Sequence, residues 1–126
     1  MNVKKLINYI NRRQEKANNR LIEENVLLGS KREKVSYFLT FKELYDNFEA
    51  SMNHLRKILK SKGKLIINGN LRLPMITKLM LLSKRHNRQF TIVVNDGYRL
   101  SKLGDVENRE HLAVIFEEER PEDRTT

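Results

Sequence analysis

Apolar residues recur at helical spacing over the first part of the chain. Between residues 3 and 27 they fall on one stripe, mostly three, four or seven positions apart, as expected for one face of an α-helix. This stripe consists of Val3, Leu6, Ile7, Ile10, Ala17 and Leu21. The other faces are rich in Lys and Arg. We therefore predict a basic helix over residues 3–27 that stops near Gly29, followed by a polar linker at Ser30–Lys34.

A second helical pattern begins at Thr40. The run Thr40-Phe41-Lys42-Glu43 has the sequence of a capping box, in which the two end side chains each satisfy a free backbone N–H. Apolar residues then follow at helical spacing up to Leu59, with acidic residues early and basic residues late, which complements the helix dipole. The pattern predicts one long helix from Thr40 to a turn at Gly63.

A third helix is predicted after Leu73. Pro74 fits its first turn, where a missing N–H costs nothing, and Asn87 can adopt the left-handed conformation that ends a helix. Short apolar runs do not distinguish helix from strand, so residues 71–73 and 79–82 are also compatible with strands of an α+β fold.

Short runs rich in β-branched and aromatic residues predict strands. They are Val35–Leu39, Lys64–Asn68, Gln89–Asn95 and Leu112–Phe116, with a further short element at Tyr98–Leu103 after an Asp96-Gly97 turn. The order α-β-α-β-α-β-β predicts an α/β single-domain sandwich, a small mixed sheet with helices packed on it. Its parts are an N-terminal basic helix (1–29), an α/β core (35–116) and an acidic tail (117–126). A chain of 126 residues has room for little beyond one domain.

Composition limits the cellular compartment of the protein and the kinds of covalent and metal site that it can form. The chain has no cysteine, which excludes disulfides and thiolate metal sites and fits a reducing, intracellular location. The cytoplasm and the mitochondrion both stay open, because the basic N-terminal helix is also typical of an organellar presequence. No apolar run approaches a membrane span, so we expect no membrane partner.

The sequence contains no motif that demands catalysis. There is no phosphate-binding glycine loop, no dinucleotide fingerprint and no nucleophile elbow. Ser83 and His86 lie three positions apart on one predicted helix, which indicates helix-end chemistry rather than a nucleophile with its base. The run Glu117–Glu119 is typical of a solvated segment. We expect a non-enzymatic protein with no cofactor and no metal.

Charge is divided unevenly along the chain. Residues 1–104 hold 22 basic against 8 acidic residues, whereas residues 105–126 hold 3 against 8. A strongly basic body predicts a polyanionic partner, with nucleic acid first. The acidic segment has three interpretations: contact with a basic neighbouring protein, shielding of the basic face before assembly, or solubility alone.

The candidate phosphate-binding residues form three clusters along the chain. They are Arg12, Arg13, Lys16 and Arg20; Arg56, Lys57, Lys60, Lys62 and Lys64; and Lys84, Arg85, His86, Arg88, Arg99 and Lys102. The second and third clusters merge if the two helix C-termini meet at one end of the sheet. Such a patch implies steeply salt-dependent binding, because each phosphate contact releases counterions. Tyr98 is either a base-stacking residue or a half-buried strand residue.

Two family resemblances arise at these residues. The first is to the small-subunit ribosomal protein eight family, whose members show Pro-x-Ile-x-x-Leu-x-x-x-Ser-Lys and then Arg-x-aromatic. It rests on residues 74–79, Ser83-Lys84 and Arg88-Gln89-Phe90, with Ile7, Ile10 and Gln14 resembling the opening helix of that family. Arg85-His86 stands where the family has Pro-Gly, and the Ser/Thr-rich RNA-binding loop of the family is missing.

The second resemblance is to the kink-turn-binding ribosomal protein family of the large subunit. It rests on residues 63–67, Pro74, Val93-Val94, Leu100 and Arg109, which look like the β-α-β core of that family. The Asn-Glu pair that grips the RNA kink is not reproduced near Met52-Asn53. The two resemblances imply different folds for residues 70–85, but both imply a basic protein that binds ribosomal RNA.

From these observations we expect non-enzymatic binding of structured RNA by a ribosomal protein engaged in translation. The expected partners are RNA, first of all rRNA, and neighbouring proteins of a ribonucleoprotein. One alternative is a DNA-binding transcriptional regulator, because the element order around Phe41–Val94 is similar to that of small-phage late-transcription activators. The other alternative is a charge-based protein adaptor or inhibitor.

Overall fold

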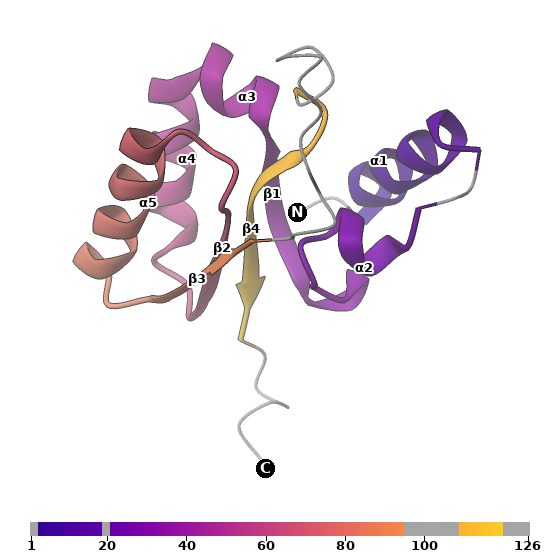
Figure 1. Cartoon of the computed structure of the whole chain (residues 1–126). Helices are drawn as coiled ribbons and strands as arrows, with labels where there is room; N and C mark the ends of the chain where they lie inside the picture. Colours follow the sequence, from indigo (N-terminus) through magenta and orange to yellow (C-terminus); the bar gives the residue numbers. More distant parts are fainter. Residues whose placement is uncertain (1–2, 19–20, 95–108, 120–126) are drawn as a thin grey trace.

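The computed structural model describes residues 3–18, 21–94 and 109–119, which form three layers (Figure 1). A four-stranded sheet lies in the middle, with α1 and α2 on one face and α3, α4 and α5 on the other. The helices are α1 (Val3–Lys16), α2 (Glu23–Val26), α3 (Phe41–Asp46), α4 (Phe48–Ile58) and α5 (Leu73–Arg85), with a 3-10 turn at Arg32–Lys34. The strands are β1 (Val35–Thr40), β2 (Gly63–Asn68), β3 (Gln89–Val93) and β4 (Leu112–Glu118). The predicted single-domain α/β fold is confirmed.

The sheet is mixed, with the strand order β1-β4-β2-β3. The last strand in the chain, β4, pairs antiparallel with both β1 and β2, whereas β2 and β3 are parallel and joined by α5. In this register Leu65 of β2 lies between Phe90 of β3 and Phe116 of β4. A central, fully flanked strand must be apolar on both faces, and residues 112–116 of β4 are all buried.

Each face of the sheet has its own apolar core. Leu65 and Ile67 of β2 belong to the core shared with α3, α4 and α5, whereas Ile66 belongs to the core shared with α1 and α2. This division follows from the period of two along a strand, which sends successive side chains to opposite faces. The three-residue run Leu65–Ile67 is therefore apolar throughout because both faces of β2 are covered.

Most elements lie where the sequence predicts them. All four strands agree within one or two residues, and the capping box at Thr40 is present with both hydrogen bonds. Pro74 lies in the first turn of α5, and Asn87 has a left-handed φ of 55° just beyond that helix. Residues 79–82 are helical, so the strand alternative for this region is wrong. The predicted element at 98–103, with Tyr98, lies outside the described residues.

The predicted helix over 3–27 is wrong in its second half. Helix α1 ends at Lys16, and Asn18 adopts a left-handed φ of 55°. The side-chain amide of Gln14 donates a hydrogen bond of 2.8 Å to the carbonyl oxygen of Leu21, which ties the returning chain to α1. The reversal lets α2 pack beside α1 against the same apolar core. This packing stabilises the fold more than a longer α1 would.

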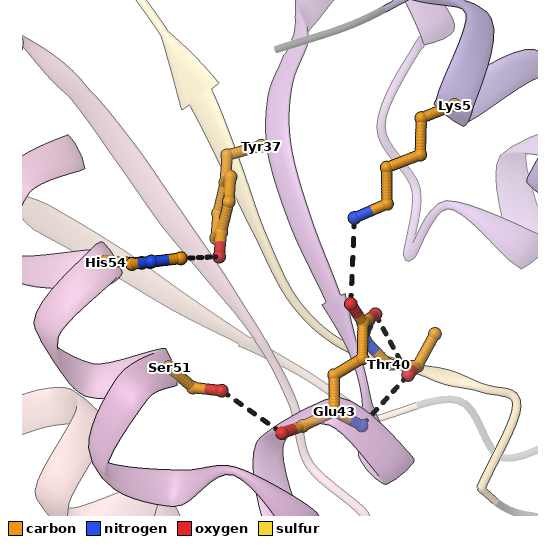
Figure 2. Close-up of polar contacts among 6 residues, drawn as sticks. All are labelled: Lys5, Tyr37, Thr40, Glu43, Ser51 and His54. Carbon is orange, nitrogen blue, oxygen red and sulfur yellow. Dashed lines mark hydrogen bonds and ion pairs between the residues drawn. The ribbon is translucent and has the colours of Figure 1, made fainter.

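The predicted long helix from Thr40 is two helices. Asn47 separates α3 from α4 with φ −131° and ψ 54°, outside the helical region. The hydroxyl of Ser51 donates a hydrogen bond of 3.1 Å to the carbonyl oxygen of Glu43, which also accepts from the backbone N–H of Asn47, so this bond joins α4 to α3 across the break (Figure 2). The bend allows the buried faces of both helices to meet the same sheet.

The acidic segment is part of the sheet at its start. The sequence predicts a tail over 117–126, but β4 continues through Glu118. Glu117 is opposite Val35 of β1 and Lys64 of β2, and only 17% of its side chain is exposed. Residues 120–126 lie outside the described part of the chain.

Candidate nucleic-acid interface

The C-terminal ends of α4 and α5 lie at the same end of the sheet, next to the starts of β2 and β3 (Figure 1). Arg88, between α5 and β3, joins them. Its Nε donates to the carbonyl oxygen of Leu59 at 2.9 Å and its Nη2 to that of Lys60 at 3.1 Å. These carbonyls belong to the two residues that directly follow α4 and lack helical partners, so Arg88 satisfies them. The second and third cationic clusters are therefore neighbours in space.

A shallow groove between α4 and α5 collects cations from both helices. Arg56 of α4 and Lys78 and Arg85 of α5 line a space of about 190 Å³. The ammonium group of Lys78 lies 4.9 Å from the ring centroid of Phe48, which holds it over an aromatic face. One carboxylate, that of Glu49, also lines the groove. Positive charge thus continues from the helix ends onto the outer surface.

A larger pocket of about 490 Å³ lies at the ends of the strands. Its cations are Lys34, Lys62, Lys64 and Arg88, and its carboxylates are those of Glu117, Glu118 and Glu119. The antiparallel pairing of β4 with β2 brings the two sets together. The ammonium of Lys64 is 3.9 Å from the carboxylate of Glu117, and the backbone N–H of Glu119 donates to the carbonyl oxygen of Lys62 at 2.8 Å.

The charge division of the sequence is therefore not a division in space. Glu117, Glu118 and Glu119 are separated from the basic clusters along the chain, yet they border the cationic end directly. Two cations of this end, Lys64 and Arg88, are half-exposed, and the other six are exposed. The exposed ones are Arg56, Lys57, Lys60, Lys62, Lys84 and Arg85. We call these eight residues the cationic end.

The described residues of the first cluster lie on α1 and do not join this surface. Arg13 is only 8% exposed, and its guanidinium donates to the hydroxyl of Tyr9 at 2.9 Å. Lys16 forms an ion pair with Glu110, and the Tyr9 hydroxyl donates to the Glu110 carbonyl oxygen at 2.6 Å. Arg13 and Lys16 thus fasten α1 to the segment before β4, and their contact with phosphate stays a prediction. Arg12 is exposed.

Three of the perturbed pKa values belong to groups at this contact between α1 and the segment before β4, whereas the fourth belongs to Tyr37 of β1. Burial raises the pKa of Tyr9, although the Arg13 guanidinium acts in the opposite direction. The hydrogen bond from Lys16 lowers the pKa of Glu110, and burial lowers the pKa of His111 to about 4. These shifts follow from structural contacts, because the groups lie between α1 and β4 rather than at an open surface.

Some predicted residues lie outside the described part of the chain, and two lining residues were not predicted. Arg20, Arg99 and Lys102 belong to the undescribed segments. Lys34 and Lys78 line the pocket and the groove, but no local pattern distinguishes them from other lysines. Lys34 reaches the pocket through the pairing of the strands, and Lys78 reaches the groove through the packing of the helices. Neither position can therefore be recognised from the sequence.

Metal-ligating side chains do not gather in the described residues, where no three of His, Cys, Asp and Glu are placed to hold an ion. Within the same ranges no helix is both long and apolar enough to cross a membrane.

Comparison with solved structures supports the fold. The chain is similar to the crystal structure of the YueI protein from Bacillus subtilis, with a TM-score of 0.56 and 19% sequence identity. The similarity covers 80% of this chain and 71% of that one. At this identity the likeness concerns the fold alone. No curated protein has a significant sequence match to this chain.

The family comparison overturns both ribosomal resemblances. A family model matches residues 7–126, which is nearly the whole chain, and it describes neither ribosomal family. Nothing in the comparisons points to a ribosomal protein or to translation. The matches at Pro74 and Ser83-Lys84 reflect a helix start and a basic helix end, which many α/β proteins share. The chain belongs to the DUF1694 family, described as proteins of unknown function.

Proposed function

We propose that this protein binds structured RNA through its cationic end, without catalysis. The observation that carries the proposal is the meeting of two sequence-distant cationic clusters at the ends of α4 and α5. Arg88 joins the two helix ends, and Arg56 and Arg85 line one groove. Phosphate contacts would position the polymer, with arginine supplying forked hydrogen bonds and lysine point charge.

The shape of this surface favours RNA over duplex DNA. It is made of helix ends, strand ends and a shallow groove. Reading the DNA major groove uses the flank of a helix or a two-stranded ribbon. Recognition by phosphate contact and shape is typical of double-helical RNA. The cationic end presents charge over a broad area and no single projecting element, which suits the second mode.

The carboxylates at the end of β4 make one part of this surface less favourable for phosphate than the other. Glu117, Glu118 and Glu119 repel phosphate from the strand-end pocket, whereas the α4–α5 groove has Glu49 as its one lining carboxylate. A polyanion therefore meets less repulsion along the groove, over Arg56 and Arg85, than in the pocket. We expect the RNA backbone to lie across the ends of α4 and α5.

The test combines crosslinking in cells, with identification of the bound polymer, and a direct binding assay. A fluorescent RNA hairpin and a DNA hairpin of the same sequence are titrated with the full chain, and anisotropy is followed. The variant Lys60→Ala/Lys84→Ala/Arg85→Ala removes three exposed cations of the cationic end. The control Arg72→Ala removes an exposed arginine next to the start of α5, at the opposite end of the sheet.

The expected result is RNA binding that the triple variant weakens at least about tenfold and the control leaves unchanged, with a shallower salt dependence in the triple variant. Preference for the DNA hairpin would overturn the RNA proposal in favour of a DNA-binding regulator. Absence of any crosslinked nucleic acid would overturn both and leave the protein adaptor.

A further inference from the structure

A second cationic hollow lies between α1 and the junction of β1 with α3. Its volume is about 460 Å³, within the range of small-molecule sites. The cations that line it are Lys4, Lys5 and Arg12 of α1 and Lys42 of α3. It is at the Thr40 end of β1, whereas the strand-end pocket includes Lys34, next to the start of that strand. The two sites are therefore at opposite ends of β1.

Two of these cations are held over aromatic rings that belong to the floor of the hollow. The ammonium of Lys5 lies 5.0 Å from the ring centroid of Phe38, and the guanidinium of Arg12 lies 5.8 Å from that of Tyr9. Both rings are almost fully buried, so their positions are fixed by the core. Stacking on a fixed ring restricts a long side chain, which reduces the entropy lost when it binds an anion.

One carboxylate lines the hollow, and it is already engaged. Glu43 accepts hydrogen bonds from the backbone N–H of Thr40 at 3.0 Å and from its hydroxyl at 3.1 Å. Lys5 reaches across from α1 to the same carboxylate at 3.6 Å, as Figure 2 shows. The Lys5 ammonium therefore bridges α1 and α3, and an incoming anion meets it already turned toward the hollow.

Two of the four cations, Arg12 and Lys42, are not neutralised within the described residues. Neither Arg12 nor Lys42 has an ion-pair partner there, and both are exposed. Together with Lys5 they surround the hollow from two helices. Four cations against one occupied carboxylate leave a net positive hollow with an aromatic floor.

We propose that this hollow binds a small organic phosphate, a phosphomonoester attached to a planar or apolar body. The dianionic phosphate would lie between Arg12 and Lys42, where forked and point-charge donors converge. The body would rest in the remaining volume above Phe38 and Tyr9. A bare inorganic phosphate uses only a part of a 460 Å³ hollow, so the ester should bind more tightly.

The probes are AMP, adenosine and inorganic phosphate, each titrated into isotopically labelled full chain and followed by backbone amide NMR. AMP has both the phosphate and the planar body, and each of the other two lacks one of them. We expect AMP to shift the amide signals of Lys5, Asn8, Arg12 and Lys42 at millimolar or lower concentration. Adenosine should not shift them, and phosphate should do so more weakly.

The variant Arg12→Ala/Lys42→Ala tests the assignment, because both side chains are exposed and their truncation leaves the core intact. We expect it to lose AMP affinity at least about tenfold, since each removed charge contributes on the order of a tenfold factor. The control Lys60→Ala/Lys84→Ala, at the cationic end, should bind AMP unchanged, and thermal melting confirms folding of both.

Three outcomes with AMP and adenosine would overturn the proposal. They are shifts confined to the signals of Lys62 and Arg88, equal shifts with adenosine, and undiminished AMP binding by the double variant. Phosphate binding as tightly as AMP would also overturn it, because the hollow would then recognise an anion without its organic body.

Discussion

Arg88 donates a hydrogen bond of 2.9 Å from its Nε to the carbonyl oxygen of Leu59, the residue that caps the C-terminus of α4. The bond joins the segment after α5 to the C-terminus of α4, 29 positions earlier in the chain. A cation that the sequence assigns to a phosphate therefore has a structural partner. This pairing holds the two helix ends together, and the cationic end depends on it.

Arg88→Ala should lower the free energy of unfolding by about 1–3 kcal/mol, because hydrogen bonds from a charged donor to the carbonyls of Leu59 and Lys60, directly after α4, are lost. The measurement is urea denaturation. Lys84→Ala is the matched control, an exposed cation of the same helix end, and should stay within about 0.5 kcal/mol of the parent. Equal stability of the two variants would mean that solvent replaces Arg88 at no cost.

Glu118→Gln/Glu119→Gln should tighten RNA binding by a factor of about three at low salt, because two charges that repel phosphate are removed from the strand-end pocket. Anisotropy with the same RNA hairpin measures the change, and raising the salt should reduce it. Glu15→Gln, on α1, is the control. Weaker binding by the double variant would show that these carboxylates help to form the RNA site.

Acid should destabilise the fold between about pH 6.5 and pH 4, through His111. Burial, with the Arg13 charge as a second cause, lowers the pKa of His111 from 6.5 to about 4. In that interval the His111 imidazole binds a proton in the unfolded chain but stays neutral in the folded chain. Stability is therefore complete above pH 6.5 and falls as the pH drops toward 4, by at most about 1.4 kcal/mol per pH unit.

Urea denaturation at several pH values checks this, and His111→Gln should flatten the curve in that interval. Glu110 affects stability at lower pH, because the pKa of its carboxyl group is below the usual value of 4.5. Its contribution to the free energy of unfolding is lost only as the pH falls through this lowered pKa. A curve that is unchanged by His111→Gln above pH 4.5 would contradict the assignment to His111.

Gly63→Ala should separate β2 from β4. A Cβ at this position would lie 2.3 Å from the carbonyl oxygen of Glu117 and 2.5 Å from the Phe116 ring, closer than atoms can approach. The backbone must shift, which costs about 1–3 kcal/mol or more. Thermal melting measures the loss, and Ser61→Ala, two positions earlier and exposed, should melt like the parent. An unshifted melting temperature for Gly63→Ala would contradict this close approach.

The sequence by itself determined the elements whose cause is local. Three consecutive apolar residues at Leu65–Ile67 predict a strand covered on both faces, because side chains alternate along a strand. Thr40 and Glu43 predict a helix start, because their side chains satisfy backbone groups only three positions away. Asn87 predicts a helix end, because it tolerates the left-handed conformation. These interactions are the same whatever the rest of the chain does.

Tertiary structure decided where helices break and which charges meet. Periodicity continues across Asn18 and Asn47, but a straight helix at either place would carry its apolar face away from the sheet, so packing overrides local propensity. Glu117 and Lys64 are more than fifty positions apart and become neighbours only through the register of β4 with β2. Arg13 and Arg88 point at protein carbonyls, because those groups lose water on folding and need a donor. Composition thus indicates a basic protein, and only the fold decides which cations remain for a partner.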